Sequence, residues 1–192
     1  MGRASRRLAE SARSAGAAQT GVGAADFAWD TAFVTEQIRP ATAADADAMA
    51  AMAARRRLQY SAYQPVFWAP APNAEEVHKP YLSALIANEG VISLVSESSG
   101  ELRGFVIASL GDAPAVYDPG GRTCMIDDFA VEPGRWNSTG AELLKAAIEL
   151  AAASGAIQAV VVTGHLDHEK RDALRACGLS IASEWWVTSA LR

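Results

Sequence analysis

The chain has 192 residues, half of them hydrophobic and 20% charged, with a formal net charge of −5 at pH 7. This length and composition predict one globular domain with a tail, and the negative charge argues against a broad nucleic-acid-binding surface. No run of residues is long and apolar enough to predict a membrane-spanning helix, so we expect a cytoplasmic protein with no membrane or nucleic-acid partner.

Composition also divides the chain. Residues 1–35 are rich in Ala, Gly, Ser and Arg, which predicts a disordered or weakly helical extension before a single domain at 36–192. The two cysteines, Cys124 and Cys177, have no metal-ligand spacing around them. We therefore expect reduced, buried thiols and no metal site.

The domain is expected to begin with an edge strand at 35–40 and a helix. The capping-box spacing of Thr42 and Asp45 marks the start of that helix, which we predict to end near residue 57. Three arginines at 55–57 could bind a phosphate or an acidic partner. The interpretation we favour is a solvated helix end that complements the helix dipole.

Aromatic and proline residues crowd the next stretch, 60–72, which is predicted to be a loop. Its aromatic side chains, Tyr60, Tyr63, Phe67 and Trp68, could line a substrate-binding surface. They could equally form a hydrophobic cluster that holds the loop in place. The sequence leaves both interpretations open.

The remaining elements alternate between strands and helices. Asn73 predicts the start of a helix to about residue 88, the runs 91–97 and 102–110 predict a hairpin, and a strand and a helix follow between 124 and 155. Three consecutive valines in 156–164 indicate a strand buried on both faces. Asp167 predicts the start of a helix at 168–177, and 179–191 is the last predicted strand. This order predicts an α/β fold with a mixed sheet.

Residues 124–148 carry the strongest functional signal. A β-prone run contains the adjacent acids Asp127 and Asp128, and a short turn then leads into a helix that begins with small polar residues. The first N–H groups of a helix lack intrahelical partners and favour anions. The stretch therefore predicts a phosphate site next to two acids.

The element order and this stretch resemble the GNAT superfamily of acetyl-CoA-dependent N-acetyltransferases, over roughly residues 38–191. The family signature is a strand that ends V-x-P, then Gln/Arg-x-x-Gly-x-Gly/Ala at a helix start, then two leucines. The matching residues are Val131, Pro133, Arg135, Gly140, Leu143 and Leu144. Two departures are Ser138 at the first glycine position and a turn before Arg135 that is one residue shorter.

The resemblance implies the acyl-CoA N-acyltransferase fold: a central mixed, mostly antiparallel sheet flanked by helices. It also implies acetyl-CoA as co-substrate, with its pyrophosphate bound by backbone N–H groups at the helix start. The implied cofactor-binding residues are Phe129, Ala130, Val131, Arg135, Trp136, Asn137, Ser138, Thr139, Gly140, Ala141 and Asp167. A serine can present its N–H as glycine does, unless Ser138 needs a positive φ. Thr139 and Glu142 have capping-box spacing, which would orient the helix start.

The strand at 126–131 resembles that of polyamine-type acetyltransferases, in which two acids bind the amine and deprotonate it through water. A primary amine is protonated at neutral pH and must lose a proton before it attacks the thioester. Neighbouring strand residues point to opposite faces, so Asp127 and Asp128 can act together only if the strand is bulged. We assign Asp127 as the catalytic base and Asp128 as amine anchor or structural acceptor. The alternative is an acid pair that only binds arginines such as Arg122.

The proton donor to the leaving thiolate is missing from its usual place. Leu174 stands where many family members have a tyrosine with that role, and a leucine cannot perform it. Water or the hydroxyl of Tyr60, Tyr63 or Tyr81 would have to substitute. His165 is a second candidate for the base, although an exposed turn residue is the simpler interpretation of His165 and His168.

These inferences combine into one leading hypothesis. The protein is expected to be an N-acetyltransferase that transfers acetyl from acetyl-CoA to a primary amine of a small molecule or peptide by direct attack. Ser138 and Leu174 motivate an alternative, a catalytically silent CoA-binding regulatory or interaction module. A third possibility is a protein or peptide N-acetyltransferase whose loop at 60–68 binds the peptide. Relatives are often dimers, so the resemblance also implies a possible homodimer.

Overall fold

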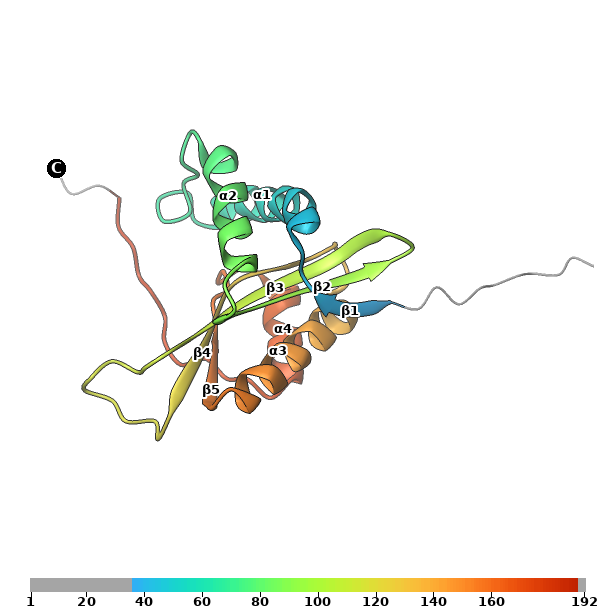
Figure 1. Cartoon of the computed structure of the whole chain (residues 1–192). Helices are drawn as coiled ribbons and strands as arrows, with labels where there is room; N and C mark the ends of the chain where they lie inside the picture. Colours follow the sequence, from blue (N-terminus) through green and yellow to red (C-terminus); the bar gives the residue numbers. More distant parts are fainter. Residues whose placement is uncertain (1–35, 190–192) are drawn as a thin grey trace, which may run out of the picture. The chain divides into compact units, whose positions relative to one another are not determined.

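A five-stranded sheet with strand order β1-β2-β3-β4-β5 organises the structure, a computed structural model that describes residues 36–189 (Figure 1). The strands are β1 (Gln37–Pro40), β2 (Val91–Ser98), β3 (Glu101–Gly111), β4 (Arg122–Val131) and β5 (Ala156–Val161). The first four strands pair antiparallel, and β5 pairs parallel with β4. The prediction for residues 1–35 lies outside the described residues.

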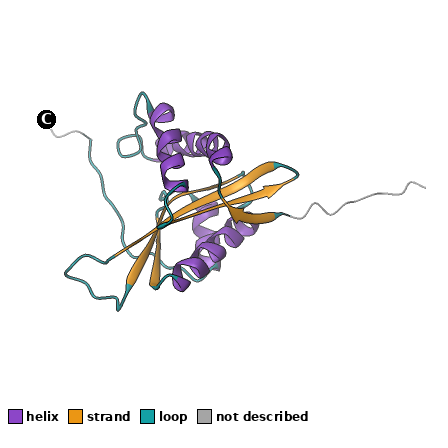
Figure 2. Ribbon diagram, viewed as in Figure 1, coloured by secondary structure: helices purple, strands orange, loops and turns teal. Residues whose placement is uncertain are grey.

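Helices cover both faces of this sheet (Figure 2). They are α1 (Ala46–Tyr63), α2 (Ala74–Ile86), α3 (Ala141–Ala153) and α4 (His168–Ala176), with a 3-10 turn η1 (Ala43–Asp45) and a π-helical turn η2 (Trp136–Gly140). No helix among residues 36–189 is long and apolar enough to cross a membrane. The predicted mixed sheet flanked by helices is confirmed.

The alternation of side chains along β3 divides the core into two halves. Phe105 and Ile107 pack with residues of α1 and α2, whereas Val106 and Ala108 pack with residues of α3 and α4. All four are at most 2% exposed. Because successive strand residues point to opposite faces, one continuous apolar run supplies both halves.

A bulge interrupts β4 at the acid pair. Phe129 pairs with Val106 and Ile126 pairs with Ala108, so Asp127 and Asp128 together stand opposite the single residue Ile107. The pairing of β4 with β5 also ends at Ile126, where the N–H of Val162 donates to the Ile126 carbonyl at 2.9 Å. Beyond this point the two strands part. We call the gap that opens between Phe129–Val131 and the end of β5 the split.

The first helix is longer than the sequence suggested. The predicted end near residue 57 is wrong, because α1 continues to Tyr63 and therefore carries Tyr60 as well. Arginine, leucine and glutamine favour helix, and no stop signal comes before Gln64, which is extended and precedes Pro65. The predicted aromatic loop begins only there.

The C-terminal part also differs from prediction. β5 is an edge strand of the described sheet rather than a strand buried on both faces, and Ile157 and Val160 are 53% and 36% exposed. The predicted last strand is wrong for the described residues 179–189, which form no regular element and leave Trp185 and Trp186 exposed. A run of β-prone residues encodes a strand but does not supply the neighbour with which it must pair.

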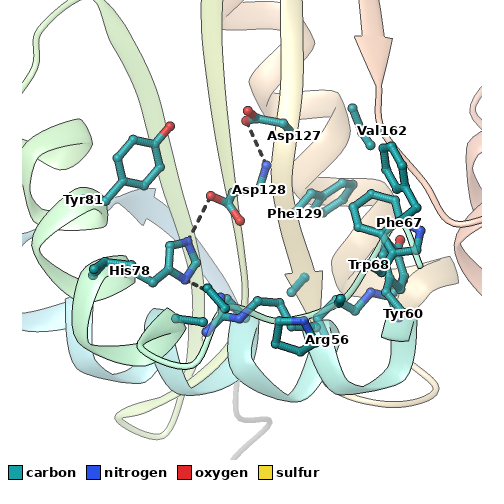
Figure 3. A pocket seen from close by; sticks show the side chains of 18 of the residues that line it. Arg56, Tyr60, Phe67, Trp68, His78, Tyr81, Asp127, Asp128, Phe129 and Val162 are labelled. Atoms are coloured by element: carbon teal, nitrogen blue, oxygen red, sulfur yellow. Dashed lines mark hydrogen bonds and ion pairs between the residues drawn. The ribbon is translucent and has the colours of Figure 1, made fainter. Parts of the chain in front are cut away.

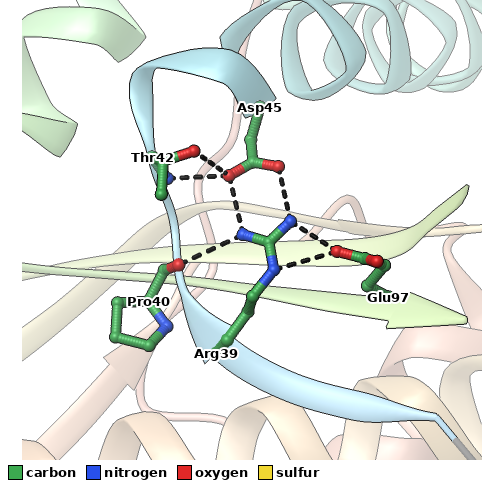
Figure 4. A network of polar contacts seen from close by, with 5 residues as sticks. All are labelled: Arg39, Pro40, Thr42, Asp45 and Glu97. Carbon is green, nitrogen blue, oxygen red and sulfur yellow. Dashed lines mark hydrogen bonds and ion pairs between the residues drawn. The ribbon is translucent and has the colours of Figure 1, made fainter. Parts of the chain in front are cut away.

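An arginine joins the first strand to the start of α1 and to β2 (Figure 4). The guanidinium of Arg39 donates to both carboxylate oxygens of Asp45, each at 2.8 Å, and through Nε to Glu97 at 2.9 Å. Asp45 also accepts the N–H of Thr42 at 2.7 Å, as the capping-box spacing predicted. The hydrogen bonds from Arg39 lower the pKa of Asp45 to about 2, although burial acts in the opposite direction.

We expect Asp45→Asn to destabilise the protein by about 2 kcal/mol at pH 7, since a folded pKa near 2 lies about two units below the usual value of this carboxyl. A lowered pKa contributes stability that is present above the unfolded value and is lost as the pH falls through the folded value. The difference between the two proteins should therefore shrink from about pH 4 to pH 2, as measured by denaturant titration. Asp47→Asn is the control, because the ion pair of Asp47 with Lys79 is exposed. An equal effect of both substitutions would contradict this account.

Candidate active site

A cavity of about 510 Å³ lies over the bulged part of β4, enclosed by α1, α2 and the loop that follows α1 (Figure 3). Residues predicted from the sequence that line it are Tyr60, Phe67, Trp68, Asp127, Asp128, Phe129 and Ala130. Residues that the sequence did not identify as part of a site include Arg56, Arg57, His78 and Lys170. The cavity therefore combines aromatic walls with two acids and several cations.

The bulge brings both acids to this cavity. Asp127 and Asp128 are adjacent in sequence, and both line the cavity, which a regular strand would not allow. One carboxylate oxygen of Asp127 accepts the backbone N–H of Asp128 at 2.9 Å. Arg122, the expected partner in the alternative interpretation, instead donates to the carbonyl oxygen of Leu110 at 3.0 Å.

His78 distinguishes the two acids. Its Nε2 lies 3.2 Å from a carboxylate oxygen of Asp128, and its Nδ1 lies 2.7 Å from a guanidinium nitrogen of Arg57 (Figure 3). A guanidinium can only donate, so Nδ1 is the acceptor and Nε2–H donates to Asp128. Asp128 is thus anchored by α1 and α2 through His78. The other carboxylate, on Asp127, is exposed at the cavity.

The arginines of α1 do not form a solvated helix end, so the interpretation we favoured for them is wrong for two of the three. Arg56 forms an ion pair with the 2%-exposed carboxylate of Asp167 and lies over the rings of Trp136 and Tyr60 at 4.8 and 4.9 Å. Arg57 holds His78. Both residues lie in the middle of α1 and face the sheet. The prediction missed this because it placed the end of the helix near residue 57.

The aromatic residues serve both of the roles that the sequence left open. Trp68 packs edge-on against Tyr60 and Phe67, with ring centroids 5.0 and 4.7 Å apart, and all three line the cavity. Phe67 also contacts Trp185 at 5.7 Å. Tyr63 lies behind Tyr60, outside the cavity lining. The cluster therefore holds the loop in place and forms a wall of the site.

The turn after β4 presents backbone N–H groups at the start of η2. Those of Trp136 and Asn137 have no backbone acceptor among residues 36–189. Arg135 lies beside them, 3.1 Å from Glu132 and 3.5 Å from Glu36. Burial alone would raise the pKa of Glu36, but hydrogen bonds from two hydroxyls and the guanidinium of Arg135 lower it. One of the hydroxyls belongs to Thr139, at 2.5 Å.

Comparisons with known proteins agree with this geometry. A family model described as the acetyltransferase (GNAT) family matches residues 56–178. The chain belongs to the GNAT acetyltransferase family. A search of curated protein sequences found no significant match.

Solved structures show the same fold at low sequence identity. A predicted acetyltransferase from Clostridium acetobutylicum, solved with acetyl-CoA, is 17% identical with a TM-score of 0.64, over 81% of this chain and 96% of that one. An aminoglycoside N-acetyltransferase in complex with CoA is 14% identical with a TM-score of 0.60, over 82% and 95%. A second, from an uncultured soil sample and in complex with sisomicin, is 14% identical with a TM-score of 0.55, over 82% and 97%.

One departure from the GNAT signature, Ser138, fits the local backbone. Among the described residues, Ser99 is the only non-glycine residue with a positive φ, so Ser138 occupies the glycine position without backbone strain, and its N–H donates to the carbonyl of Arg135 at 3.3 Å. The predicted capping box is wrong, because the hydroxyl of Thr139 donates to Glu36 and Gly140 precedes α3 without a side-chain cap. Ala141 is the first residue of α3.

Several other residues lie away from the cavity. His165 and His168 are exposed, and Leu174 is buried in the core beneath α3 and α4. Cys124 is buried, which raises the pKa of its thiol, but Cys177 is exposed, contrary to prediction. No group of side chains in the described part of the chain could hold a metal ion.

Gly140 is required by packing against Trp136 rather than by its backbone angles. A Cβ at this position would lie 2.9 Å from Cε3 of the Trp136 ring, which is 3% exposed. The ring cannot move without disturbing Arg56, Phe129 and Lys170, which all contact it.

We therefore expect Gly140→Ala to lower the free energy of unfolding by about 1–3 kcal/mol, the usual effect of overpacking. Gly111→Ala is the matched control, since nothing lies within 4 Å of a Cβ there. Denaturant titration of both variants tests this, and an unchanged midpoint for Gly140→Ala would show that the ring is not fixed.

Proposed function

We propose that this GNAT protein transfers the acetyl group of acetyl-CoA to a primary amine bound in the cavity, with Asp127 as general base. The observation that carries the proposal is the bulge, which places the carboxylate of Asp127 at the cavity while His78 holds Asp128. We also propose that residues 36–192 form the acetyltransferase domain, which extends the family match at 56–178 by 20 residues before it and 14 after it.

The chain offers a path for acetyl-CoA. Its pyrophosphate would bind the free N–H groups of Trp136 and Asn137, with the guanidinium of Arg135 nearby. The pantetheine arm would run along the split. There the carbonyl of Phe129 faces away from β3, and by strand alternation the N–H groups of Phe129 and Val131 face the same way. Neighbouring structures with bound acetyl-CoA or CoA support acetyl-CoA as the co-substrate.

The acceptor is a cationic amine. Two carboxylates and the aromatic side chains of Trp68 and Tyr81 line the cavity, and both kinds of group favour an ammonium ion. Structural neighbours that are aminoglycoside N-acetyltransferases support an amine acceptor of some size. A small-molecule amine and a peptide amine both fit this chemistry.

The reaction follows from these positions. The ammonium group loses a proton to Asp127, directly or through a water molecule, and the free amine nitrogen attacks the thioester carbonyl carbon. The N–H groups along the split can donate to the oxyanion that forms. The tetrahedral intermediate then collapses, the C–S bond breaks, and the products are the acetylated amine and CoA. Asp128, fixed by His78, orients the amine.

Asp127→Asn tests the base directly. The amide keeps the size of the side chain and can still accept the Asp128 N–H. We expect kcat for CoA release to fall at least about tenfold, because general bases contribute typically 10²–10⁴-fold. Acetyl-CoA should still raise the Tm of Asp127→Asn. The difference in kcat between this variant and the wild type should narrow as the pH approaches the pKa of the amine itself.

Asp112→Asn, on an exposed loop, is the matched control and should remain fully active. Full activity of Asp127→Asn at every pH would show that Asp127 is not the base. If acetyl-CoA raises the Tm of the wild-type protein but no amine is acetylated, the protein is a CoA-binding module without catalysis.

A further inference from the structure

Lys170 is a buried cation that the mechanism above does not use. It lies in the first turn of α4 and is 1% exposed, yet it lines the same cavity as the acids. Its Nζ donates to the carbonyl of Val162 at 2.8 Å and approaches that of Phe129 at 3.4 Å. These two carbonyls belong to opposite sides of the split. The ammonium group therefore spans the gap through which the thioester would enter.

Among residues 36–189, the ammonium group of Lys170 forms no ion pair with a carboxylate; its hydrogen bonds go to backbone carbonyls. Arg56 forms an ion pair with the nearby carboxylate of Asp167, and Nζ of Lys170 lies over the rings of Phe129 and Trp136, 5.1 and 5.3 Å from their centroids. With Arg56, Lys170 and Asp167 all charged, the buried cluster has one excess positive charge. Such an excess favours an anion that forms in the split.

The groups that face Lys170 shift its pKa in opposite directions. Burial lowers the pKa of Lys170 to about 8, and Arg56 on α1 acts in the same direction. Tyr60 on α1 and the acids Asp128 and Asp127 on β4 act to raise it. The ammonium form thus predominates at neutral pH, but its proton is far easier to remove than that of an ordinary lysine.

Other candidates for a proton donor are engaged or misplaced. Tyr63 lies outside the cavity lining. The hydroxyl of Tyr60 donates to Asp167 at 2.9 Å. Tyr81 is half exposed beside the acids, and burial together with Asp127 and Asp128 raises its pKa.

We propose, on the basis of the proposed function, that Lys170 is the general acid of the reaction and protonates the CoA sulfur as the C–S bond breaks. The new C–N bond forms at the carbonyl carbon, the electron pair of the C–S bond stays on sulfur, and sulfur takes a proton from Nζ. The substrate nitrogen loses two protons in all. The first passes through Asp127 to solvent, and the second returns through water to the neutral amine of Lys170.

Two variants separate this role from a structural one. Lys170→Gln can still donate a hydrogen bond to a carbonyl across the split but has no proton to give. Lys170→Met keeps an unbranched apolar chain and removes both functions. Tyr60→Phe removes the competing hydroxyl. The experiment measures kcat for CoA release from acetyl-CoA with a primary amine between pH 6 and about pH 10, and the Tm shift produced by acetyl-CoA.

We expect wild-type kcat to fall as the pH rises above about 8, where Lys170 loses its proton. Lys170→Gln and Lys170→Met should both lose about 10²-fold in kcat at pH 7 and lack this fall at high pH. Acetyl-CoA should still shift the Tm of both variants. The kcat of Tyr60→Phe should still fall as the pH rises above about 8.

Four results would overturn the assignment. If Lys170→Gln restores kcat that Lys170→Met has lost, the side chain only joins the two strands. If Tyr60→Phe abolishes the fall at high pH while Lys170→Gln keeps it, the tyrosine is the acid. A wild-type protein that releases no CoA with any amine contradicts the proposed function and this assignment together, whereas an active wild type with an unaltered Lys170→Gln contradicts this assignment alone.

Discussion

The register shift in β4 is the constraint on which the candidate site depends. Two acids oppose the single residue Ile107, and the pairing of β4 with β5 ends at Ile126, the residue before the acids. A regular strand would direct one carboxylate to each face of the sheet, into cores that are apolar on both sides. The bulge instead turns both toward the cavity, and beyond Ile126 no strand pairs with the edge of β4 that carries the N–H groups of Phe129 and Val131. One local departure from regular pairing thus supplies both halves of the site.

Side chains from three helices then contact the polar groups on and next to β4 and β5. His78 on α2 and Arg57 on α1 anchor one acid and leave the other available. Arg56 on α1 neutralises Asp167, and Lys170 on α4 reaches the split from the opposite face of the sheet. Apart from the exposed Asp127, these polar groups are largely buried, so each of them must be paired or must have a shifted pKa. The fixed positions of these groups follow from the packing of the helices that carry them.

Sequence patterns predicted the elements whose causes are local. The hairpin of β2 and β3, the start of α2 after Asn73, and the Asp167 cap of α4 all depend on residues within a few positions. The acid pair was found for the same reason, and the need for a bulge followed from strand alternation. His78 and Lys170 could not be found in this way, because their partners Asp128 and Phe129 lie 50 and 41 residues away. The lack of a regular element at 179–189 could not be predicted either, because a strand needs a neighbouring strand that its own residues do not specify.

The central claim is that the cavity and the split together perform acetyl transfer. Its most direct test is the stoichiometry of the products when the wild-type protein is given acetyl-CoA and a panel of primary amines, with free thiol measured by absorbance and the acetylated amine by mass spectrometry. We expect one acetylated amine for each CoA released, with at least one amine of the panel. Release of CoA without an acetylated amine, or no release at all while acetyl-CoA stabilises the fold, would contradict it.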